Sequence, residues 1–370
     1  MKQQIYFNDF NNNLESIIQM NEFSNVLIVC SKRIKNSQFS NNENYIFFDC
    51  YEYNPKIKDV ERLVSLILHM KPDVVVAIGG GTAIDLAKQA SLLSESNKGS
   101  IKEHIIKKSY VTTDSTVPMI AIPTTAGTGS ESTKFSVVYI DGIKFSVEHD
   151  LMIPNFVILD PRLLSGCPKH IIASTAIDAL TQSIESIWSV HSTSESRNYA
   201  SESIKLINEN LYEAYKTQYK DNDVALNMIN AANLSGKAIN ISKTTAPHAI
   251  SYPLTSYHDV PHGHAVGMII PKFFSINDKV NDNTLNDKRG VDYVKDTMKY
   301  VYSLFNCSDN ISMSEYFTSL MTDLSLETNF KRIGVSSDND IKNILSDVNL
   351  SRLQNNPVIV SKQEIKQIFL

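Results

Sequence analysis

Four short apolar segments in the first part of the chain constrain the fold most, because none of them alternates between apolar and polar residues. They are Val26–Cys30, Tyr45–Phe48, Val74–Ile78 and Met119–Ile122. Strands that are apolar on both faces are typical of parallel sheets covered by helices on both sides. Between these segments, residues 60–70 and 83–93 place apolar side chains at helical spacing. This alternation predicts an N-terminal α/β domain with a Rossmann-like parallel sheet.

The alternation of strand-like and helical segments ends at Pro161. Residues 170–190, 195–219 and 224–242 are long helical patterns with no strand candidate between them. The chain has 370 residues, more than one hydrophobic core usually supports. We therefore expect an α/β domain over residues 1–161 and an all-α domain over residues 162–370.

Composition and charge limit which partners the protein is expected to bind and in which cellular compartment it is expected to lie. The net charge of -5 gives no electrostatic attraction to nucleic acid or to an anionic membrane, so neither is expected as a partner. The first residues lack a basic segment followed by an apolar run, and no apolar stretch is long enough to span a bilayer. Four scattered cysteines suit reduced thiols better than a disulfide framework or a thiolate metal site. We expect a cytoplasmic protein.

Two loops have the composition of a phosphate-binding site. Gly79, Gly80, Gly81 and Thr82 follow an apolar strand and open a helix that also carries Asp85, so backbone N–H groups can approach a pyrophosphate at the helix N-terminus. A tight strand-to-helix turn would need the same glycines. A second loop follows the next strand and carries hydroxyl groups, those of Thr124, Thr125, Thr128 and Ser130. Loops after neighbouring parallel strands converge where dinucleotides bind. We predict that all these residues bind a cofactor.

A second group of residues has the composition of a metal site. In the predicted helix at residues 170–190, Asp178, Gln182 and Glu185 project from one side. Four of the nine histidines fall in one short region, as His248, His258, His262 and His264. A carboxylate with two neutral imidazoles suits Fe²⁺ or Zn²⁺ and leaves a position open for a substrate oxygen. A solvated helix face and unrelated structural histidines would explain the same residues.

These motifs together resemble the iron-containing alcohol dehydrogenases. Four segments carry the resemblance in the family's order: Gly79–Lys88, Pro123–Ser132, Asp178–Glu185 and Pro261–Ala265. The resemblance implies a dehydroquinate synthase-like fold, a homodimer, and NAD(P)-linked interconversion of a small aldehyde and its alcohol. It also implies a metal held between the domains by an Asp and three His, with Fe²⁺ expected and Zn²⁺ as the alternative.

Residue by residue, three of the family's metal ligands match this sequence. They are Asp178, His248 and His262, and the fourth position falls on Gln182. A Gln carbonyl oxygen can bind a metal, but it is neutral and binds more weakly than imidazole. We therefore assign the chemistry to the three matching residues and expect Gln182 to be a weak ligand or a hydrogen-bonding neighbour of the site.

A finer resemblance concerns the substrate. Thr244–Tyr257, Pro261–His264, Ile187–Val190 and Gln182 are similar to the phosphonoacetaldehyde reductases. This similarity implies reduction of phosphonoacetaldehyde to 2-hydroxyethylphosphonate in phosphonate biosynthesis. A phosphonate dianion needs cations or N–H donors beyond the metal. The candidates are Lys144, His149, His258 and His264.

The implied reaction is hydride transfer from nicotinamide to an aldehyde whose oxygen the metal polarises. Tyr252 and His264 are candidates to relay the proton that follows. Ser31 stands where NAD-preferring relatives tend to have an Asp, and Lys32 and Arg33 follow it. This favours NADPH over NADH, because a 2′-phosphate prefers small or basic neighbours.

Three other interpretations remain open. The substrate would be an unphosphorylated short-chain aldehyde or diol in the first. In the second, the protein is a lyase of the dehydroquinate synthase type, which regenerates its nicotinamide and consumes no reduced cofactor. In the third, prompted by Gln182, the protein binds a nucleotide without catalysis.

Overall fold

The computed structural model describes residues 3–39, 45–95, 99–109, 115–348 and 350–370. The chain divides into two compact units. Unit 1 comprises residues up to Thr125 and Gly129–Ser165, and unit 2 comprises Ala126–Thr128 and Gly166–Leu370. The units divide shortly after the predicted boundary at Pro161, and the short segment Ala126–Thr128 belongs to the second unit.

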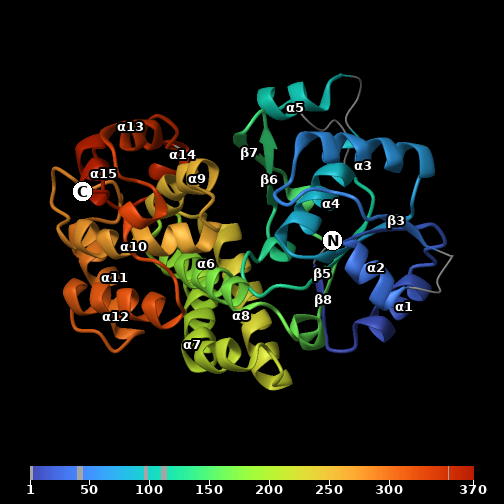
Figure 1. Ribbon diagram of the computed structural model, residues 1–370, viewed down its shortest axis with the longest axis horizontal. Coiled ribbons are helices and arrows are strands. Elements are labelled where there is room, and N and C mark those ends of the chain that lie inside the picture. Colours follow the sequence, from blue (N-terminus) through green and yellow to red (C-terminus); the bar gives the residue numbers. More distant parts are fainter. Residues whose placement is uncertain (1–2, 40–44, 96–98, 110–114, 349) are drawn as a thin grey trace. The chain divides into compact units, whose positions relative to one another are not determined.

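A six-stranded sheet with only parallel pairings forms the centre of unit 1 (Figure 1). Its strands, in spatial order, are β1 (Gln4–Phe7), β8 (Phe156–Leu159), β5 (Met119–Pro123), β4 (Val74–Gly79), β2 (Val26–Cys30) and β3 (Ile46–Phe48). The predicted parallel sheet is confirmed. Strands β1 and β8 extend it beyond the four segments that sequence patterns had indicated.

Helices cover both faces of this sheet, which explains why its strands have no polar face. They are α1 (Phe10–Met20), α2 (Lys32–Gln38), α3 (Ile57–Met70) and α4 (Gly81–Leu93), whereas the short α5 (Ile101–Lys107) of the same unit contacts the hairpin described next. Because successive side chains of a strand point to opposite faces, Leu27 and Val75 belong to the core cluster formed with α3 and α4. Their neighbours Ile28 and Val76 belong to the cluster formed with α1.

A β-hairpin not predicted from the sequence packs on α4. Its antiparallel strands are β6 (Phe135–Ile140) and β7 (Ile143–Glu148). Three short 3₁₀ helices lie near it or after β8: η1 (Ser130–Ser132), η2 (Asp150–Met152) and η3 (Pro161–Leu164). The hairpin follows directly on the second predicted cofactor loop. The contacts between α4 and β6 therefore help to hold that loop beside the start of α4.

Unit 2 is helical, as predicted. Its elements are α6 (Lys169–Trp188), α7 (Ser194–Thr217), α8 (Asn222–Ser242), α9 (Ala246–His258), α10 (His262–Asp278), α11 (Val291–Ser303), α12 (Asn310–Asp323), η4 (Phe330–Ile333), α13 (Asp338–Ser346), α14 (Leu350–Leu353) and α15 (Lys362–Ile368). Within its described residues, only an isolated bridge between Leu285 and Val358 is β-structure. Among the described residues of the chain, no helix is long and apolar enough to cross a membrane.

Helix α6 is the central helix of unit 2 and packs against α7, α8 and α10 (Figure 1). All its residues from Ala176 to Trp188 are buried, those with polar side chains included. The alternative that Asp178, Gln182 and Glu185 form a solvated helix face is therefore wrong. Buried carboxylates and amides require polar partners, because removing them from water is otherwise costly. The polar neighbours of these three side chains lie on α8, on α9, in the segment before α9 and at the start of α10.

Candidate functional site

Three predicted ligands come together within unit 2. Asp178 lies in the middle of α6, His248 in the first turn of α9, and His262 is the first residue of α10. His248 Nε2 is 3.5 Å and His262 Nε2 is 3.9 Å from Asp178 Oδ1. The candidate ligand atoms of these three residues all lie within 4.8 Å of one another. Asp178 and His248 are buried, whereas the His262 side chain is 30% exposed, so the group is accessible from one side.

Gly263 allows His262 to reach this position. A Cβ atom at residue 263 would lie 2.0 Å from the carbonyl oxygen of Ser174 and 2.7 Å from Asp178 Cβ. Both contacts are far below van der Waals distance, and one is to backbone that cannot move easily. A glycine is therefore required where the first turn of α10 crosses α6. The Pro-His-Gly sequence thus brings one ligand beside another.

Glu185 orients His248 from the side opposite Asp178. It is fully buried on α6, and its carboxylate contacts His248 Nδ1. The same carboxylate accepts hydrogen bonds from the His248 backbone N–H and the Thr245 hydroxyl, each at 3.1 Å. A carboxylate at Nδ1 holds a proton on that nitrogen, so in the neutral ring the lone pair lies on Nε2, the nitrogen nearest Asp178. The sequence pattern places Glu185 in one polar group with Asp178 but does not indicate its contact with His248.

The charges around His248 show that the site favours a cation. Burial alone lowers the pKa of His248, but Glu185 and Asp178 outweigh this effect and raise the pKa to about 9. One carboxylate oxygen and two imidazole nitrogens, largely shielded from water, are a donor set suited to Fe²⁺ or Zn²⁺. These residues therefore fit the metal that the family resemblance implies.

Gln182 is buried one turn after Asp178 on α6. Its Oε1 is 2.9 Å from the hydroxyl of Ser235 on α8, and that hydroxyl also lies 3.0 Å from the carbonyl oxygen of Ala179. A serine hydroxyl has one hydrogen to donate, so it cannot fully serve both acceptors. The Ser235 hydroxyl and a bound metal would thus compete for the same oxygen, Gln182 Oε1. Metal ligation by Gln182 stays a prediction.

The two predicted proton-relay residues lie in different surroundings. The Tyr252 ring stacks on His262, with 5.5 Å between ring centroids and 27° between planes. His264 Nε2 is instead 2.6 Å from the carbonyl oxygen of Glu327, in the segment after α12. Burial lowers the pKa of His264, although the contacts with Glu327 oppose this effect. Tyr252 therefore adjoins one of the three ligands, His262, whereas His264 connects α10 to another segment.

The other predicted phosphonate-binding residues also have defined positions. His258 is the last residue of α9, and its Nδ1 would be 3.2 Å from a Cβ at Gly334. Lys144 on β7 and His149 before η2 belong to unit 1. His149 Nδ1 accepts a hydrogen bond from the Leu151 backbone N–H at 3.2 Å, so this nitrogen carries no proton.

In unit 1, the two predicted cofactor loops follow neighbouring strands, as expected. Gly79 ends β4 and Gly80 precedes α4, whose first residues are Gly81 and Thr82. Thr124, after β5, donates its backbone N–H to the Gly79 carbonyl at 3.0 Å, and a Cβ at Gly80 would lie 3.2 Å from Thr125 Oγ1. A Cβ at Gly79 would also lie only 2.7 Å from Ala83 Cβ. The glycines therefore permit close packing of strand, helix and second loop.

Asp85 and Ser130 hydrogen-bond to each other inside unit 1. Asp85 accepts from the Ser130 hydroxyl at 2.5 Å and from the Val137 backbone N–H at 2.8 Å. Lys88, one turn later on α4, is buried and donates to the Ser130 carbonyl, Thr133 Oγ1 and the Phe135 carbonyl at 2.6–2.9 Å. Burial lowers the pKa of Lys88 to about 8 despite the nearby carboxylates. This network, which sequence analysis missed, joins α4 to the second loop.

The two remaining predicted cofactor residues lie elsewhere. Ser31 follows β2 and caps α2, accepting a hydrogen bond from the Ile34 backbone N–H at 3.3 Å. Thr128 belongs to the segment grouped with unit 2, where a Cβ at Gly127 would lie 2.4 Å from Thr175 Cβ on α6. Their cofactor contacts stay predictions.

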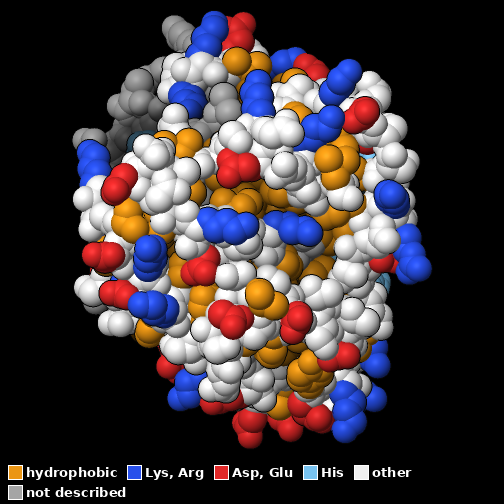
Figure 2. Space-filling model, turned by 90° about the vertical axis from the view of Figure 1, so that its left-hand side faces the viewer, with side chains coloured by type: hydrophobic (Ala, Val, Ile, Leu, Met, Phe, Trp, Pro, Cys, Tyr) orange, Lys and Arg blue, Asp and Glu red, His pale blue; other side chains and the backbone are white. Residues whose placement is uncertain are grey.

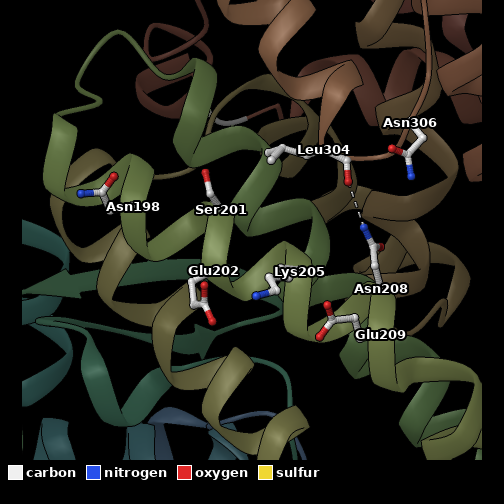
Figure 3. Close-up of a pocket in the computed structure, with 8 residues that line it drawn as sticks. All are labelled: Asn198, Ser201, Glu202, Lys205, Asn208, Glu209, Leu304 and Asn306. Atoms are coloured by element: carbon white, nitrogen blue, oxygen red, sulfur yellow. Dashed lines mark hydrogen bonds between the residues drawn. The ribbon is translucent and has the colours of Figure 1, made fainter.

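Two surface hollows of unit 2 contain none of these residues. The first, about 640 Å³, has a polar lining along α7 in which Asn208 donates to the Leu304 carbonyl at 3.3 Å (Figure 3). The second, about 1040 Å³, is lined by residues of α10, α12 and α15, with Lys272, Lys279 and Lys331 among them. Figure 2 shows a face on which apolar side chains gather around two adjacent cationic side chains. Neither hollow has the donor set of a metal site.

Comparison with protein families covers both units. Residues 3–161 match the family model described as iron-containing alcohol dehydrogenase. Residues 172–370 match the model described as Fe-containing alcohol dehydrogenase family, C-terminal. The chain therefore belongs to the iron-containing alcohol dehydrogenase family.

Curated relatives are similar over part of their length. Long-chain-alcohol dehydrogenase 1 of Geobacillus thermodenitrificans is 34% identical over 218 residues, which cover 59% of this chain and 55% of that protein. Phosphonoacetaldehyde reductase of Streptomyces viridochromogenes is 33% identical over 244 residues, covering 64% of this chain and 61% of that protein. The chain thus spans about three fifths of the length of these relatives.

A solved structure matches the whole fold. Sulfoacetaldehyde reductase from Bifidobacterium kashiwanohense, solved in complex with NAD+, superposes with a TM-score of 0.85 at 25% identity. The match covers 99% of this chain and 96% of that one. An α/β unit with a parallel sheet followed by a helical unit is therefore the architecture of this family.

Proposed function

We propose that the protein is a metal-dependent, nicotinamide-linked alcohol dehydrogenase that interconverts a small aldehyde and its primary alcohol. The convergence of Asp178, His248 and His262, with Glu185 behind His248, is the observation that carries this proposal. Family membership and the paired loops after β4 and β5 support a dinucleotide as the second reactant.

We propose phosphonoacetaldehyde as the substrate and 2-hydroxyethylphosphonate as the product. The similarity to phosphonoacetaldehyde reductase supports this choice. The fold similarity to sulfoacetaldehyde reductase supports the wider class, since both named substrates are two-carbon aldehydes with a tetrahedral anionic group. The similarity to a long-chain alcohol dehydrogenase favours the alternative, an aldehyde without charge.

Asp178, His248 and His262 would hold the metal, with Gln182 as a proposed weaker ligand. When bound, a divalent cation polarises the carbonyl and reduced nicotinamide supplies the hydride. Asp178 would provide the negative charge that keeps a cation in the site, and Glu185 would hold the proton of the neutral His248 ring on Nδ1, so that Nε2 is the nitrogen that binds the metal. Burial raises the pKa of Tyr252, so its phenol keeps its proton at neutral pH. We assign to Tyr252, beside His262, delivery of the final proton to the alcohol oxygen, with His264 as the alternative.

We propose NADPH as the preferred cofactor. Ser31 provides no carboxylate at the end of β2, and the exposed Lys32 and Arg33 follow it at the start of α2. An acidic residue there would attract the ribose hydroxyls of NADH and repel a 2′-phosphate. The homodimer and the cytoplasmic location stay predictions from the family resemblance and the sequence.

The proposal is tested by purifying the protein anaerobically and loading it separately with Fe²⁺ and Zn²⁺. Oxidation of NADPH and NADH is followed with phosphonoacetaldehyde, lactaldehyde and butyraldehyde. We expect metal-dependent oxidation of one cofactor per aldehyde, fastest with phosphonoacetaldehyde and NADPH. Asp178→Asn should abolish it, whereas Glu202→Gln, at an exposed position on α7, should not change it.

Each other interpretation has its own outcome. Turnover with only the uncharged aldehydes would retain the dehydrogenase and reject the phosphonate substrate. A substrate-dependent reaction that consumes no reduced cofactor would favour the lyase. Nucleotide binding without metal binding or turnover would favour the noncatalytic protein.

A further inference from the structure

Thr245 directly precedes α9, and its hydroxyl bonds to α6 instead of capping α9. A threonine at this position usually accepts a hydrogen bond from the backbone N–H two or three residues later, but the described residues at the start of α9 form no such bond. Glu185 on α6 takes over this role, because its Oε1 accepts from the His248 backbone N–H at 3.1 Å. The carboxylate that contacts the His248 ring therefore also fixes the His248 backbone.

Trp188, the last residue of α6, fixes the direction of the Thr245 hydroxyl. Its indole Nε1 donates to Thr245 Oγ1 at 2.9 Å, and an indole nitrogen can only donate. The Thr245 oxygen is thus the acceptor in this contact, and its one hydrogen goes to Glu185 Oε1 at 3.1 Å. These bonds run in one direction, from Trp188 through Thr245 to Glu185, and end at the carboxylate beside His248.

This network is shielded from water. Trp188, Thr245, Glu185 and His248 are all buried. A buried polar group that loses its partner is not compensated by solvent, so each bond of the network affects the next one. Trp188 also packs edge-on against Phe274 of α10, with 6.0 Å between the ring centroids. The indole is therefore held in place by the helix that supplies the third predicted ligand.

The segment before α9 is held at two further points. Ser189 Oγ, just after α6, donates to the Ser242 carbonyl at 2.7 Å. Asn355 Nδ2, just after α14, donates to the Thr244 carbonyl at 2.9 Å. These bonds fix the backbone that leads into α9, so the Thr245 side chain starts from a defined position beside α6.

We propose that Trp188 and Thr245 are positioning residues of the metal site. They hold the Glu185 carboxylate so that one oxygen fixes the His248 backbone and the other contacts Nδ1. In the neutral ring this leaves Nε2, the nitrogen nearest Asp178, to bind the metal. The inference rests on the proposed function, since it takes His248 as a metal ligand.

The affinity for Zn²⁺, measured by competition with a chelating dye, tests this role without a catalytic assay. Thr245→Val removes the hydroxyl at nearly constant size, and we expect it to bind Zn²⁺ about 5- to 30-fold more weakly than the wild type. Thr245→Ser keeps the hydroxyl and should restore the affinity to within about twofold of the wild type. Trp188→Phe should weaken binding by less, about 3- to 10-fold, because the Thr245 hydroxyl can still donate to Glu185.

Thr181→Val is the matched control. Thr181 is as buried as Thr245, and its hydroxyl donates to carbonyl oxygens of its own helix. We expect this variant to lower the free energy of unfolding in urea but to keep the Zn²⁺ affinity. The visible spectrum of the Co²⁺-loaded protein reports ligand geometry, so it should change in Thr245→Val and stay as in the wild type in Thr181→Val.

The outcomes separate this inference from the proposed function. A Zn²⁺ affinity of Thr245→Val within about twofold of the wild type, or an equal loss in Thr181→Val, would overturn the positioning role. If Thr245→Val does not fold, Trp188→Phe decides: a weaker affinity supports the inference, and an unchanged one overturns it. The expected losses of affinity without reduction of any aldehyde would reject the proposed function and keep the positioning role. A wild-type protein that binds no Zn²⁺ would overturn both.

Discussion

Replacing Glu185 with Gln isolates the contribution of the carboxylate behind His248. The amide has almost the same shape, and its oxygen can keep the hydrogen bonds from Thr245 and the His248 backbone. Its NH₂ group then faces His248 Nδ1, where the native carboxylate accepts. Two donors cannot face each other, so His248 must either move or transfer its proton to Nε2. Either change removes one of the three ligand atoms from the site.

The magnitude follows from the cost of that conflict. A buried donor left without its acceptor costs about 1–3 kcal/mol, which corresponds to about 5- to 150-fold in affinity at 1.36 kcal/mol per tenfold. Loss of a carboxylate that supports a metal-bound histidine typically weakens binding about 10- to 100-fold. We therefore expect Zn²⁺ to bind Glu185→Gln about 10- to 100-fold more weakly than the wild type.

Competition with a chelating dye at pH 7.5 measures this affinity without any catalytic assay. The visible spectrum of the Co²⁺-loaded protein reports ligand geometry and should also change. Glu202→Gln, which removes an exposed carboxylate on α7, is the matched control. A Zn²⁺ affinity of Glu185→Gln within twofold of the wild type, with an unchanged Co²⁺ spectrum, would refute the orienting role of Glu185.

Three further predictions follow from the same contacts. Gly263→Ala should destabilise unit 2 by about 1–3 kcal/mol or more and weaken Zn²⁺ binding, because the new Cβ meets the Ser174 carbonyl oxygen. Unfolding in urea with and without Zn²⁺ measures both effects. A wild-type free energy of unfolding and a wild-type stabilisation by Zn²⁺ would contradict the prediction. His248 has a pKa raised from 6.5 to about 9 in the metal-free fold, so it stabilises that fold below pH 6.5 and ceases to do so as the pH rises through about 9. A metal needs the neutral ring, so its binding at pH 7.5 should release about one proton and tighten with rising pH; calorimetry in buffers of different ionisation heat measures this, and pH-independent affinity would be inconsistent with it. Ser31→Asp should keep the cap of α2 and shift the ratio of kcat/KM values from NADPH toward NADH by about tenfold or more; an unchanged ratio would remove Ser31 from the cofactor site.

Local patterns in the sequence predicted the parts of the fold that depend on local chemistry. Val26–Cys30 and Val74–Ile78 are apolar on both faces because helices cover both sides of the sheet. Strand β1 has exposed ends at the edge of the sheet, so it lacks this signature. Strand β6 alternates buried and half-buried residues, and β7 is largely exposed or half-buried, so the hairpin also differs from strands that are apolar on both faces.

The sequence predicts which residues form the candidate site, but it does not predict which of their side chains contact one another. His262 and His264 are close in the sequence, yet residues two apart on a helix point in different directions. The structure accordingly places His262 beside Asp178 and His264 beside Glu327. Glu185 was visible as a polar residue on α6, but its contact with His248 depends on how α6 and α9 pack.

Lys88 has a consequence for how such proteins can be recombined. Its ammonium is bonded to the backbone at Ser130 and Phe135, so the glycine-containing turn and the second loop share one buried cation. A chimera that takes residues 79–88 from a relative without a lysine at position 88 would leave these carbonyls without their donor. Residues 79–88 and 130–137 should therefore be exchanged together, because a crossover between them that removes Lys88 should destabilise the first unit even when both parents fold well.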